Sequence, residues 1–217
     1  MDEKLQRLAE WSVGLEISGT AITDAAQARD IHIADSLAGV DVAPVRDAAR
    51  IVDIGSGAGF PGLVLAVALP ETEVVLVDSV RKKMEAAAKI ARELELENVE
   101  CVWGRAEEIA ELGSPQRESF DVVTARALAQ LNILLEYSNP LLATGGHLVA
   151  WKGAPERGEL EAAAGTAAKL GFGEGELIET KPFSDSRTRH FYVAEKLSGT
   201  PQGYPRRPGM ALKRPLG

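Results

Sequence analysis

The chain has 217 residues, of which 45% are apolar, and its formal net charge is −8. This is enough apolar material for one sizeable hydrophobic core, and the absence of any run of about 18 apolar residues excludes a membrane-spanning helix. The opening residues, MDEKLQRLAEW, lack the apolar centre of a signal peptide, so we expect a cytoplasmic protein.

Neither metal binding nor oligomerisation is indicated by the pattern of residues. Cys101 is the only cysteine, and the three histidines are scattered. Because no spacing typical of a metal site joins them, we expect no metal ion. No heptad pattern or large apolar face indicates a dimer, so we expect a monomer.

The first 45 residues predict a helical extension. Leu5, Leu8 and Leu15 recur near helical spacing, and a second helical pattern covers residues 24–40 before Pro44. We therefore divide the chain into a helical extension at 1–45, a central domain at 46–197 and a basic, Pro-rich tail at 198–217.

From residue 50 onward, short apolar strands alternate with helices. This alternation predicts parallel βαβ units and a doubly wound, mostly parallel α/β sheet, closed by ELIETKPF and RHFYVAEK as an antiparallel pair. The predicted strands are IVDIG, EVVLVD, NVECVW, FDVVTARA and GGHLVAWKG, and the predicted helices are PGLVLAVAL, VRKKMEAAAKIARELEL with Ser79 as its cap, AEEIAEL, LNILLEYSNPLLA and ELEAAAGTAAKLGF.

A glycine-rich turn, IVDIGSGAGFPG at residues 51–62, follows the first of these strands. Glycine allows the backbone to turn sharply and to approach a ligand closely. Gly57, Gly59 and Gly62 match the dinucleotide pattern GxGxxG, which is weak when it stands alone. The run from Asp53 to Gly59 also matches Asp-x-Gly-x-Gly-x-Gly, a pattern of class I S-adenosylmethionine-dependent methyltransferases. An acid at the strand end suits a ligand with an amine, which favours the second interpretation.

Residues after the next two strands support an adenosine-type ligand. Asp78 ends the second strand, where a carboxylate can accept hydrogen bonds from ribose hydroxyls; a simple turn acid is the alternative. The loop after the third strand can reach an adenine edge through the amides of Ala106 and Glu107.

Two cations end buried strands. Arg126 follows FDVVTA and Lys152 follows LVAW. A charge in such a place is costly unless it is paired, so a salt bridge and a contact with ligand or substrate both remain open for each.

The tail concentrates positive charge. After Lys196 it contains Arg206, Arg207, Lys213 and Arg214 but no acid, which leaves a net charge of −12 for the remainder. Such asymmetry indicates either a polyanion-binding tail or a solvated terminus.

Several segments together resemble one family. IVDIGSGAGFPGL, VVLVDSVRKK, GRAEE, FDVVTARA and LVAWKG occur in the order and spacing of the ribosomal RNA small subunit methyltransferase G family, as do IHIADSL, RHFYVAEK and YPRRPGMALKRPL, over residues 5–215. Ile31 stands where the family has an arginine.

The resemblance implies a class I methyltransferase that uses S-adenosylmethionine to methylate N7 of one guanine in 16S ribosomal RNA, free or in the small ribosomal subunit. Carried over by position, the cofactor contacts fall on Gly55, Phe60, Ala106, Glu107 and Arg126, and Asp78 would hold the ribose. We expect the strand acid and the rest of the turns to join them: Asp53, Ser56, Gly57, Gly59 and Ser79. Arg126 and Lys152 are the expected catalytic residues. RNA binding is assigned to His32, Asp35, Ser36, Arg189, Arg206, Arg207, Lys213 and Arg214.

Three other functions are compatible with parts of the sequence. A class I methyltransferase could act on a small molecule or a protein, although the basic tail argues against this. An NAD-dependent oxidoreductase would need a catalytic Tyr-Lys pair or His, which the motifs do not supply. A ribosome-binding protein without activity would have no need of the intact Asp53–Gly59 motif.

Overall fold

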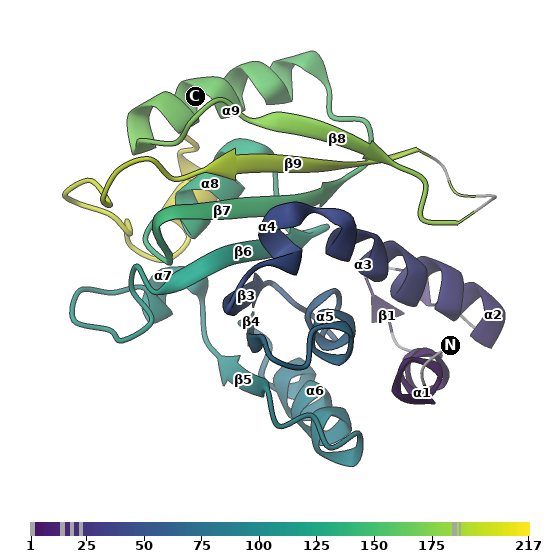
Figure 1. The fold of residues 1–217 in the computed structure, drawn as a ribbon. Coiled ribbons are helices and arrows are strands. Elements are labelled where there is room, and N and C mark those ends of the chain that lie inside the picture. The colour runs from purple at the N-terminus through teal and green to yellow at the C-terminus, as the bar shows by residue number, and fades with distance from the viewer. Residues whose placement is uncertain (1–2, 14–15, 18–19, 22–23, 184–185, 187) are drawn as a thin grey trace.

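A computed structural model describes residues 3–13, 16–17, 20–21, 24–183, 186 and 188–217 (Figure 1). Its centre is a seven-stranded sheet of strand order β5-β4-β3-β6-β7-β9-β8. The strands are β3 (Arg50–Ile54), β4 (Glu73–Asp78), β5 (Val99–Trp103), β6 (Phe120–Arg126), β7 (Leu142–Lys152), β8 (Glu176–Thr180) and β9 (Arg189–Glu195).

The five strands from β3 to β7 are parallel, and β9 pairs antiparallel with both β7 and β8. The predicted doubly wound sheet and its antiparallel closing pair are therefore confirmed. The strand order reverses at β3, where β4 and β6 lie on either side. This is the switch point at which such sheets bind ligands.

Helices cover both faces of the sheet (Figure 1). They are α5 (Gly62–Ala68), α6 (Arg81–Glu93), α7 (Ala106–Ile109), α8 (Leu131–Ser138), α9 (Arg157–Leu170) and α10 (Met210–Lys213). Alternate strand residues face opposite layers: Ile51 packs with α5 and α6 in one apolar cluster, whereas Val52 packs with α8 and α9 in the other. This burial of both faces explains why the strands are continuous apolar runs.

Two details differ from the prediction for these helices. Ser79 does not cap α6, because the N-cap position is Val80 and the Val80 N–H donates to Oδ1 of Asp78 at 2.8 Å. In the helix predicted over LNILLEYSNPLLA, with an interruption before Pro140 as one alternative, residues 131–138 are helical, and β7 already begins at Leu142.

The N-terminal segment forms short helical pieces. These are α1 (Glu3–Ser12), α2 (Ala25–Ala28), a π-helical turn η1 (Arg29–Ala34), α3 (Asp35–Leu37), a 3-10 turn η2 (Ala38–Asp41) and α4 (Ala43–Arg46), with a small ladder of β1 (Glu16–Ile17) and β2 (Thr20–Ala21). The helix predicted over 24–40 is therefore present as a helical stretch from Ala25 to Asp41, with a π-helical middle and a 3-10 end.

This segment shares its core with the sheet. Leu8 and Ile33 are buried in the same cluster as α5 and α6. The Trp151 indole of β7 donates to the Asp35 carbonyl at 2.8 Å, and a Cβ on Gly39 would lie 2.3 Å from the same ring. The N-terminal helices are therefore fixed against the ends of β6 and β7.

Candidate active site

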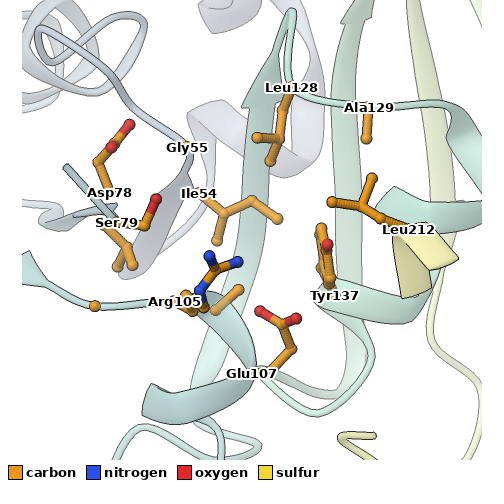
Figure 2. A pocket seen from close by; sticks show the side chains of 13 residues that line it. Ile54, Gly55, Asp78, Ser79, Arg105, Glu107, Leu128, Ala129, Tyr137 and Leu212 are labelled. Atoms are coloured by element: carbon orange, nitrogen blue, oxygen red, sulfur yellow. The ribbon is translucent and has the colours of Figure 1, made fainter. Parts of the chain in front are cut away.

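A cavity of about 200 Å³ lies at the carboxyl ends of β3, β4, β5 and β6 (Figure 2), and we call it the carboxyl-edge cavity. Figure 2 places Asp78 and Ser79 on one side of it and Leu128, Ala129 and Leu212 on the other. Its lining is Ile54, Gly55, Val77, Asp78, Ser79, Gly104, Arg105, Ala106, Glu107, Leu128, Ala129, Tyr137 and Leu212.

The glycine turn brings backbone to this cavity. Gly55 has φ +63°, a conformation that residues with a Cβ rarely adopt. A Cβ there would also lie 2.5 Å from Cδ1 of Leu128, across the turn. Gly55 therefore meets both a conformational and a steric requirement.

Asp78 connects the turn to the next strand. Its Oδ2 accepts from the Gly57 N–H at 2.9 Å, and its Oδ1 accepts from the Val80 N–H at 2.8 Å. A carboxylate offers about four acceptor positions, so about two remain for hydroxyl groups of a ligand. The side chain lines the cavity and is suited to the vicinal hydroxyls of a ribose.

The far end of the cavity combines a helix start with a phenol. Ala106 and Glu107 are the first two residues of α7, so their N–H groups have no intrahelical partner. Burial, reinforced by the Glu107 carboxylate, raises the pKa of Tyr137 to about 12. The phenol is thus neutral at physiological pH and can donate a hydrogen bond.

Apolar side chains close the remaining walls. Leu128 is 39% exposed and Leu212 is 57% exposed, and both line the cavity. A ligand that covers these apolar side chains removes their surface from water, which stabilises the complex. The combination of apolar walls, ribose acceptor and free amides fits the adenosine half of S-adenosylmethionine.

Five of the predicted cofactor residues line this cavity: Gly55, Asp78, Ser79, Ala106 and Glu107. The others are not among its lining residues: Asp53, Ser56, Gly57, Gly59, Phe60 and Arg126.

Asp53, one of the expected cofactor residues, does not line the cavity. It is fully buried, and its carboxylate accepts from the Gly62 N–H at 2.9 Å and from the Thr124 hydroxyl at 3.0 Å. Burial raises the pKa of Asp53 to about 7. The side chain therefore ties the start of α5 to β3 and β6 and shapes the turn from beneath.

The Ser56 and Gly59 positions are also internal to the turn. The Ser56 N–H donates to the Val77 carbonyl at 3.1 Å, and the side chain is buried. A Cβ on Gly59 would lie 2.4 Å from Cδ1 of Leu63. These residues build the turn, with no side chain directed to the cavity.

Arg126 is the centre of a second group of side chains, which we call the Arg126 cluster: His32, Asp35, Ser36, Phe60 and Arg126. Nη1 of Arg126 lies 3.0 Å from Oδ2 of Asp35 and 3.3 Å from Oγ of Ser36. The His32 ring stacks on Phe60 with centroids 5.1 Å apart, and the Arg126 guanidinium carbon lies 5.8 Å from the Phe60 centroid.

The three residues expected near the RNA target, His32, Asp35 and Ser36, are buried, at 3%, 5% and 0% exposed. Asp35 and Ser36 hold Arg126, and His32 lies against Phe60. Among the described residues, Nη2 of Arg126 and both ring nitrogens of His32 are buried without a hydrogen-bond partner, so the cluster retains unused polar groups.

Burial, with the Arg126 charge as the second cause, lowers the pKa of His32 to about 4. The imidazole is therefore neutral at physiological pH, and one nitrogen donates while the other accepts.

Lys152 is paired with an acid beside the cavity wall, since its Nζ also lies 3.5 Å from the carbonyl oxygen of Ala129. Its Nζ lies 2.6 Å from Oε1 of Glu159, and the same oxygen accepts from the Leu131 N–H at 3.0 Å. Both side chains are mostly buried. The lysine predicted as catalytic thus joins β7 to the starts of α8 and α9.

The basic residues expected to bind RNA are either ion-paired or exposed. Arg206 forms an ion pair with the buried Glu136, so it is structural. Arg189 is half-exposed and pairs with Asp35 at 3.3 Å. Arg207, Lys213 and Arg214 are exposed.

A larger cavity, of about 630 Å³, lies beside α9 and β8 and is lined by Leu160, Phe172 and Tyr192 among others. It contains none of the predicted site residues, and it lies away from the carboxyl ends of the parallel strands. We therefore assign no chemistry to it.

Metal binding and membrane spanning can be assessed for the residues that the structure describes. No group of three or more His, Cys, Asp or Glu side chains there is arranged to hold a metal ion. No helix in the described part of the chain combines the length and apolarity needed to cross a membrane.

Comparison with known proteins decides the family. The model of a protein family described as rRNA small subunit methyltransferase G matches residues 1–186. Relatives named ribosomal RNA small subunit methyltransferase G include one from Moorella thermoacetica, 40% identical over 91% of this chain and 82% of its own length. Another, from Brevibacillus brevis, is 38% identical over 99% of this chain and 89% of its own length. The chain belongs to the ribosomal RNA small subunit methyltransferase G family.

As a member of this family, the protein is an enzyme that uses S-adenosylmethionine. Its fold is that of the O-methyltransferase TomG from Streptomyces achromogenes in complex with SAM, with a TM-score of 0.62, 22% identity and 91% of each chain covered. Cofactor-bound Rv0187 from MTB is similar, with a TM-score of 0.60, 21% identity and 90% of each chain covered.

Sequence reasoning missed the walls of the cavity. Leu128 and Ala129 come two and three residues after Arg126, so their place after a parallel strand was a usable signal. Tyr137 lies inside α8, and Leu212 lies in α10, about 100 residues beyond α7. No local pattern indicates that these two reach the cavity.

Proposed function

We propose that this enzyme transfers a methyl group from S-adenosylmethionine to N7 of a guanine in 16S ribosomal RNA. Family membership supports the substrate, and the observation that carries the proposal is the carboxyl-edge cavity, where Asp78, the Gly55 turn and the start of α7 meet. When bound, the cofactor supplies an electrophilic methyl group on a sulfonium.

The chain's residues hold the nucleoside half of the cofactor. Asp78 would offer acceptors to ribose hydroxyls, the α7 amides would bind an adenine edge, and Leu128 and Leu212 would supply apolar contact to the adenosine. The bare backbone at Gly55 permits close approach.

The Arg126 cluster is the proposed site for the reacting end of the cofactor and for guanine. Its unused donors, Nη2 of Arg126 and one nitrogen of His32, are suited to a carboxylate or to guanine O6. Because these groups are buried and held by Asp35 and Phe60, they are preorganised for orientation.

Guanine N7 carries a lone pair and no proton, so this transfer needs no general base. The site is consistent with that chemistry, since the pKa of His32, lowered to about 4, makes its imidazole a weak base, and the Asp53 carboxylate is bound internally. The acceleration then comes mainly from alignment of the reacting atoms, an effect worth up to roughly 7–11 kcal/mol. The base must be accessible, as in a single-stranded loop of RNA.

The exposed cations Arg207, Lys213 and Arg214 supply the proposed contacts to RNA phosphates. They lie close in sequence to Leu212, a wall of the cavity, so the phosphate contacts flank the cofactor site. This explains how an acidic protein can bind a polyanion.

The test uses tritiated-methyl S-adenosylmethionine and small ribosomal subunits that lack this modification, followed by digestion of the RNA to nucleosides. We expect label in 7-methylguanosine with the wild-type enzyme and almost none with Asp78→Ala. An Asp47→Ala variant, changed at an exposed acid near α4, is the control and should retain activity. Absence of RNA label from wild-type enzyme that still binds S-adenosylhomocysteine would overturn the substrate assignment.

A further inference from the structure

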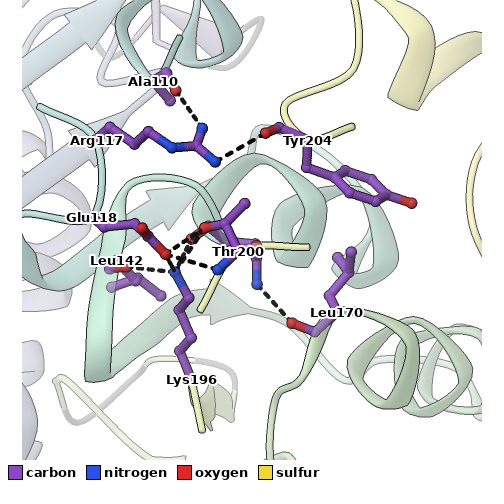
Figure 3. Close-up of polar contacts among 9 residues, drawn as sticks. Ala110, Arg117, Glu118, Leu142, Leu170, Lys196, Thr200 and Tyr204 are labelled. Carbon is purple, nitrogen blue, oxygen red and sulfur yellow. Dashed lines mark hydrogen bonds and ion pairs between the residues drawn. The ribbon is translucent and has the colours of Figure 1, made fainter. Parts of the chain in front are cut away.

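Residues 198–217, which we call the strap, begin beside Glu118, just before β6, and reach the carboxyl-edge cavity through Leu212. Close-packed anchors hold the first part of the strap (Figure 3). Lys196, fully buried, donates to Oε1 of Glu118 and to Oγ1 of Thr200 at 2.8 and 2.9 Å. Arg117 donates to the Tyr204 carbonyl at 3.1 Å.

The middle of the strap is anchored by charge, because Arg206 pairs with the buried Glu136 of α8. A buried lysine just before the strap and an ion pair with a buried glutamate therefore hold this first half, and both contacts are costly to separate. It serves as a fixed base for the second half of the strap.

The second half of the strap includes α10, reaches the cavity and is held by single hydrogen bonds. The Gly209 N–H donates to Oε1 of Glu107 at 2.8 Å, and Nδ2 of Asn132 donates to the Leu216 carbonyl at 2.6 Å. Gly209 has φ +79° and starts α10. Ala211 is buried in the core, and the adjacent Leu212 lines the cavity while remaining 57% exposed.

Glu107 thus has two roles at one position. Its backbone belongs to the first turn of α7, at the cavity, and its side chain holds the α10 end of the strap. A ligand against α7 and a docked α10 are joined through this residue.

We propose that the strap forms the outer wall of the cofactor site, with Glu107 as its positioning residue and Leu212 as its contact to the adenosine moiety. Cofactor binding and docking of α10 then stabilise each other, because coupling between two equilibria is reciprocal. This inference rests on the proposed placement of the cofactor in the carboxyl-edge cavity, but not on the identity of the methyl acceptor.

Hydrogen exchange read by mass spectrometry tests the coupling, with S-adenosylhomocysteine as the probe. We expect the probe to slow exchange in a peptide spanning 207–217 and to leave a peptide from α9 unchanged. Equal exchange of the 207–217 peptide with and without a saturating probe would overturn the proposal.

Variants assign the roles. Leu212→Ala removes exposed apolar surface, so its thermal midpoint without ligand should match wild type while the Kd for S-adenosylhomocysteine rises about tenfold. Glu107→Ala should raise the same Kd and abolish the slowing of exchange, and Glu107→Gln, which keeps an acceptor for Gly209, should restore both. Glu111→Ala, at an exposed acid just after α7, is the matched control with wild-type values.

The outcomes separate this proposal from the function. An unchanged Kd in Leu212→Ala would overturn the strap as a wall even if the enzyme methylates guanine. Conversely, protection of the strap by S-adenosylhomocysteine supports the proposal even if RNA is not the acceptor.

Discussion

Gly55 and Gly57 have nearly the same backbone conformation, with φ +63° and +59°, but different surroundings. A Cβ at Gly55 would lie 2.5 Å from Leu128, whereas a Cβ at Gly57 would meet nothing within 4 Å. Comparing substitutions at the two positions therefore separates the effect of backbone strain from the effect of a steric clash with Leu128.

We predict that Gly55→Ala weakens S-adenosylhomocysteine binding at least tenfold more than Gly57→Ala. Both variants incur the left-handed backbone penalty of about 1–2 kcal/mol, but only the first forces Leu128 to move at the cavity. Isothermal titration calorimetry measures both constants, and circular dichroism checks the fold. Equal loss in the two variants would show that contact with Leu128 is unimportant for the site.

The sequence identified individual site residues where chemistry and strand position coincide. Asp78 and Gly55 follow adjacent parallel strands, so their meeting is dictated by the topology. Strand position alone did not reveal the internal partner of Asp53, because the next helix supplies the Gly62 N–H that binds the carboxylate. For Lys152 the structure shows the salt bridge that was one of the two alternatives, with Glu159 on α9.

His32 gives a prediction on pH. Its pKa is about 4 when folded, against 6.5 for an unperturbed imidazole, with burial the main cause and Arg126 the second. Between these values the unfolded chain binds a proton that the folded protein does not. The free energy of unfolding contributed by His32 is therefore complete above about pH 6.5 and falls as the pH drops toward 4.

We expect His32→Gln to remove this dependence, worth about 3 kcal/mol across the window. Asp53, with its raised pKa, acts in the opposite sense over part of the same range, so the measured quantity is the difference between wild type and variant. Urea unfolding at several pH values provides it, with His190→Gln as the control. A difference that does not vary with pH would contradict the assigned burial of a neutral imidazole.

At the scale of elements, the strands and major helices followed from apolar runs and their spacing. The helix over 24–40 also followed from spacing, but its π-helical and 3-10 portions did not; this stretch lies against Trp151, more than 110 residues away in sequence. The N-cap of α6 is Val80 rather than Ser79, and the Val80 N–H donates to Asp78.

The basic tail was also only partly predictable. Charge alone cannot distinguish Arg206 from Arg207, although one is paired with Glu136 and the other is exposed. The buried partner lies 70 residues earlier, in a helix whose sequence is otherwise largely apolar.

This difference predicts that substituting the two neighbouring arginines changes stability by very different amounts. Arg206→Ala leaves Glu136 buried and unpaired, which should cost about 3–5 kcal/mol and lower the thermal midpoint by roughly 10 °C. Arg207→Ala should change stability by less than about 0.5 kcal/mol. Differential scanning fluorimetry compares them, and similar midpoints for the two variants would contradict the structural role of Arg206.

For the whole molecule, the net charge of −8 opposes contact with a polyanion, so RNA affinity has to come from a local surface. The strap supplies exposed cations beside a cavity that also uses its Leu212. Cofactor site and phosphate contacts are then built from one continuous segment, which is consistent with the strap as a wall.

Salt dependence tests this arrangement directly. The logarithm of an RNA association constant falls linearly with the logarithm of salt concentration, with a slope set by the number of phosphate contacts. We predict that Lys213→Gln reduces the magnitude of this slope by about 0.7–0.9, the value for one contact. Lys169→Gln, at an exposed lysine in the last turn of α9, should leave the slope unchanged although it alters net charge equally.

Filter binding of a 16S ribosomal RNA fragment over a series of salt concentrations measures these slopes. A smaller slope in Lys213→Gln alone means that phosphate contacts are made at the strap rather than by net charge. If both lysine variants reduce the slope equally, the RNA responds to the overall charge of the protein, and the strap has no privileged place in binding. The measurement thus distinguishes a local surface from a global field, because the two variants differ only in where the charge is removed.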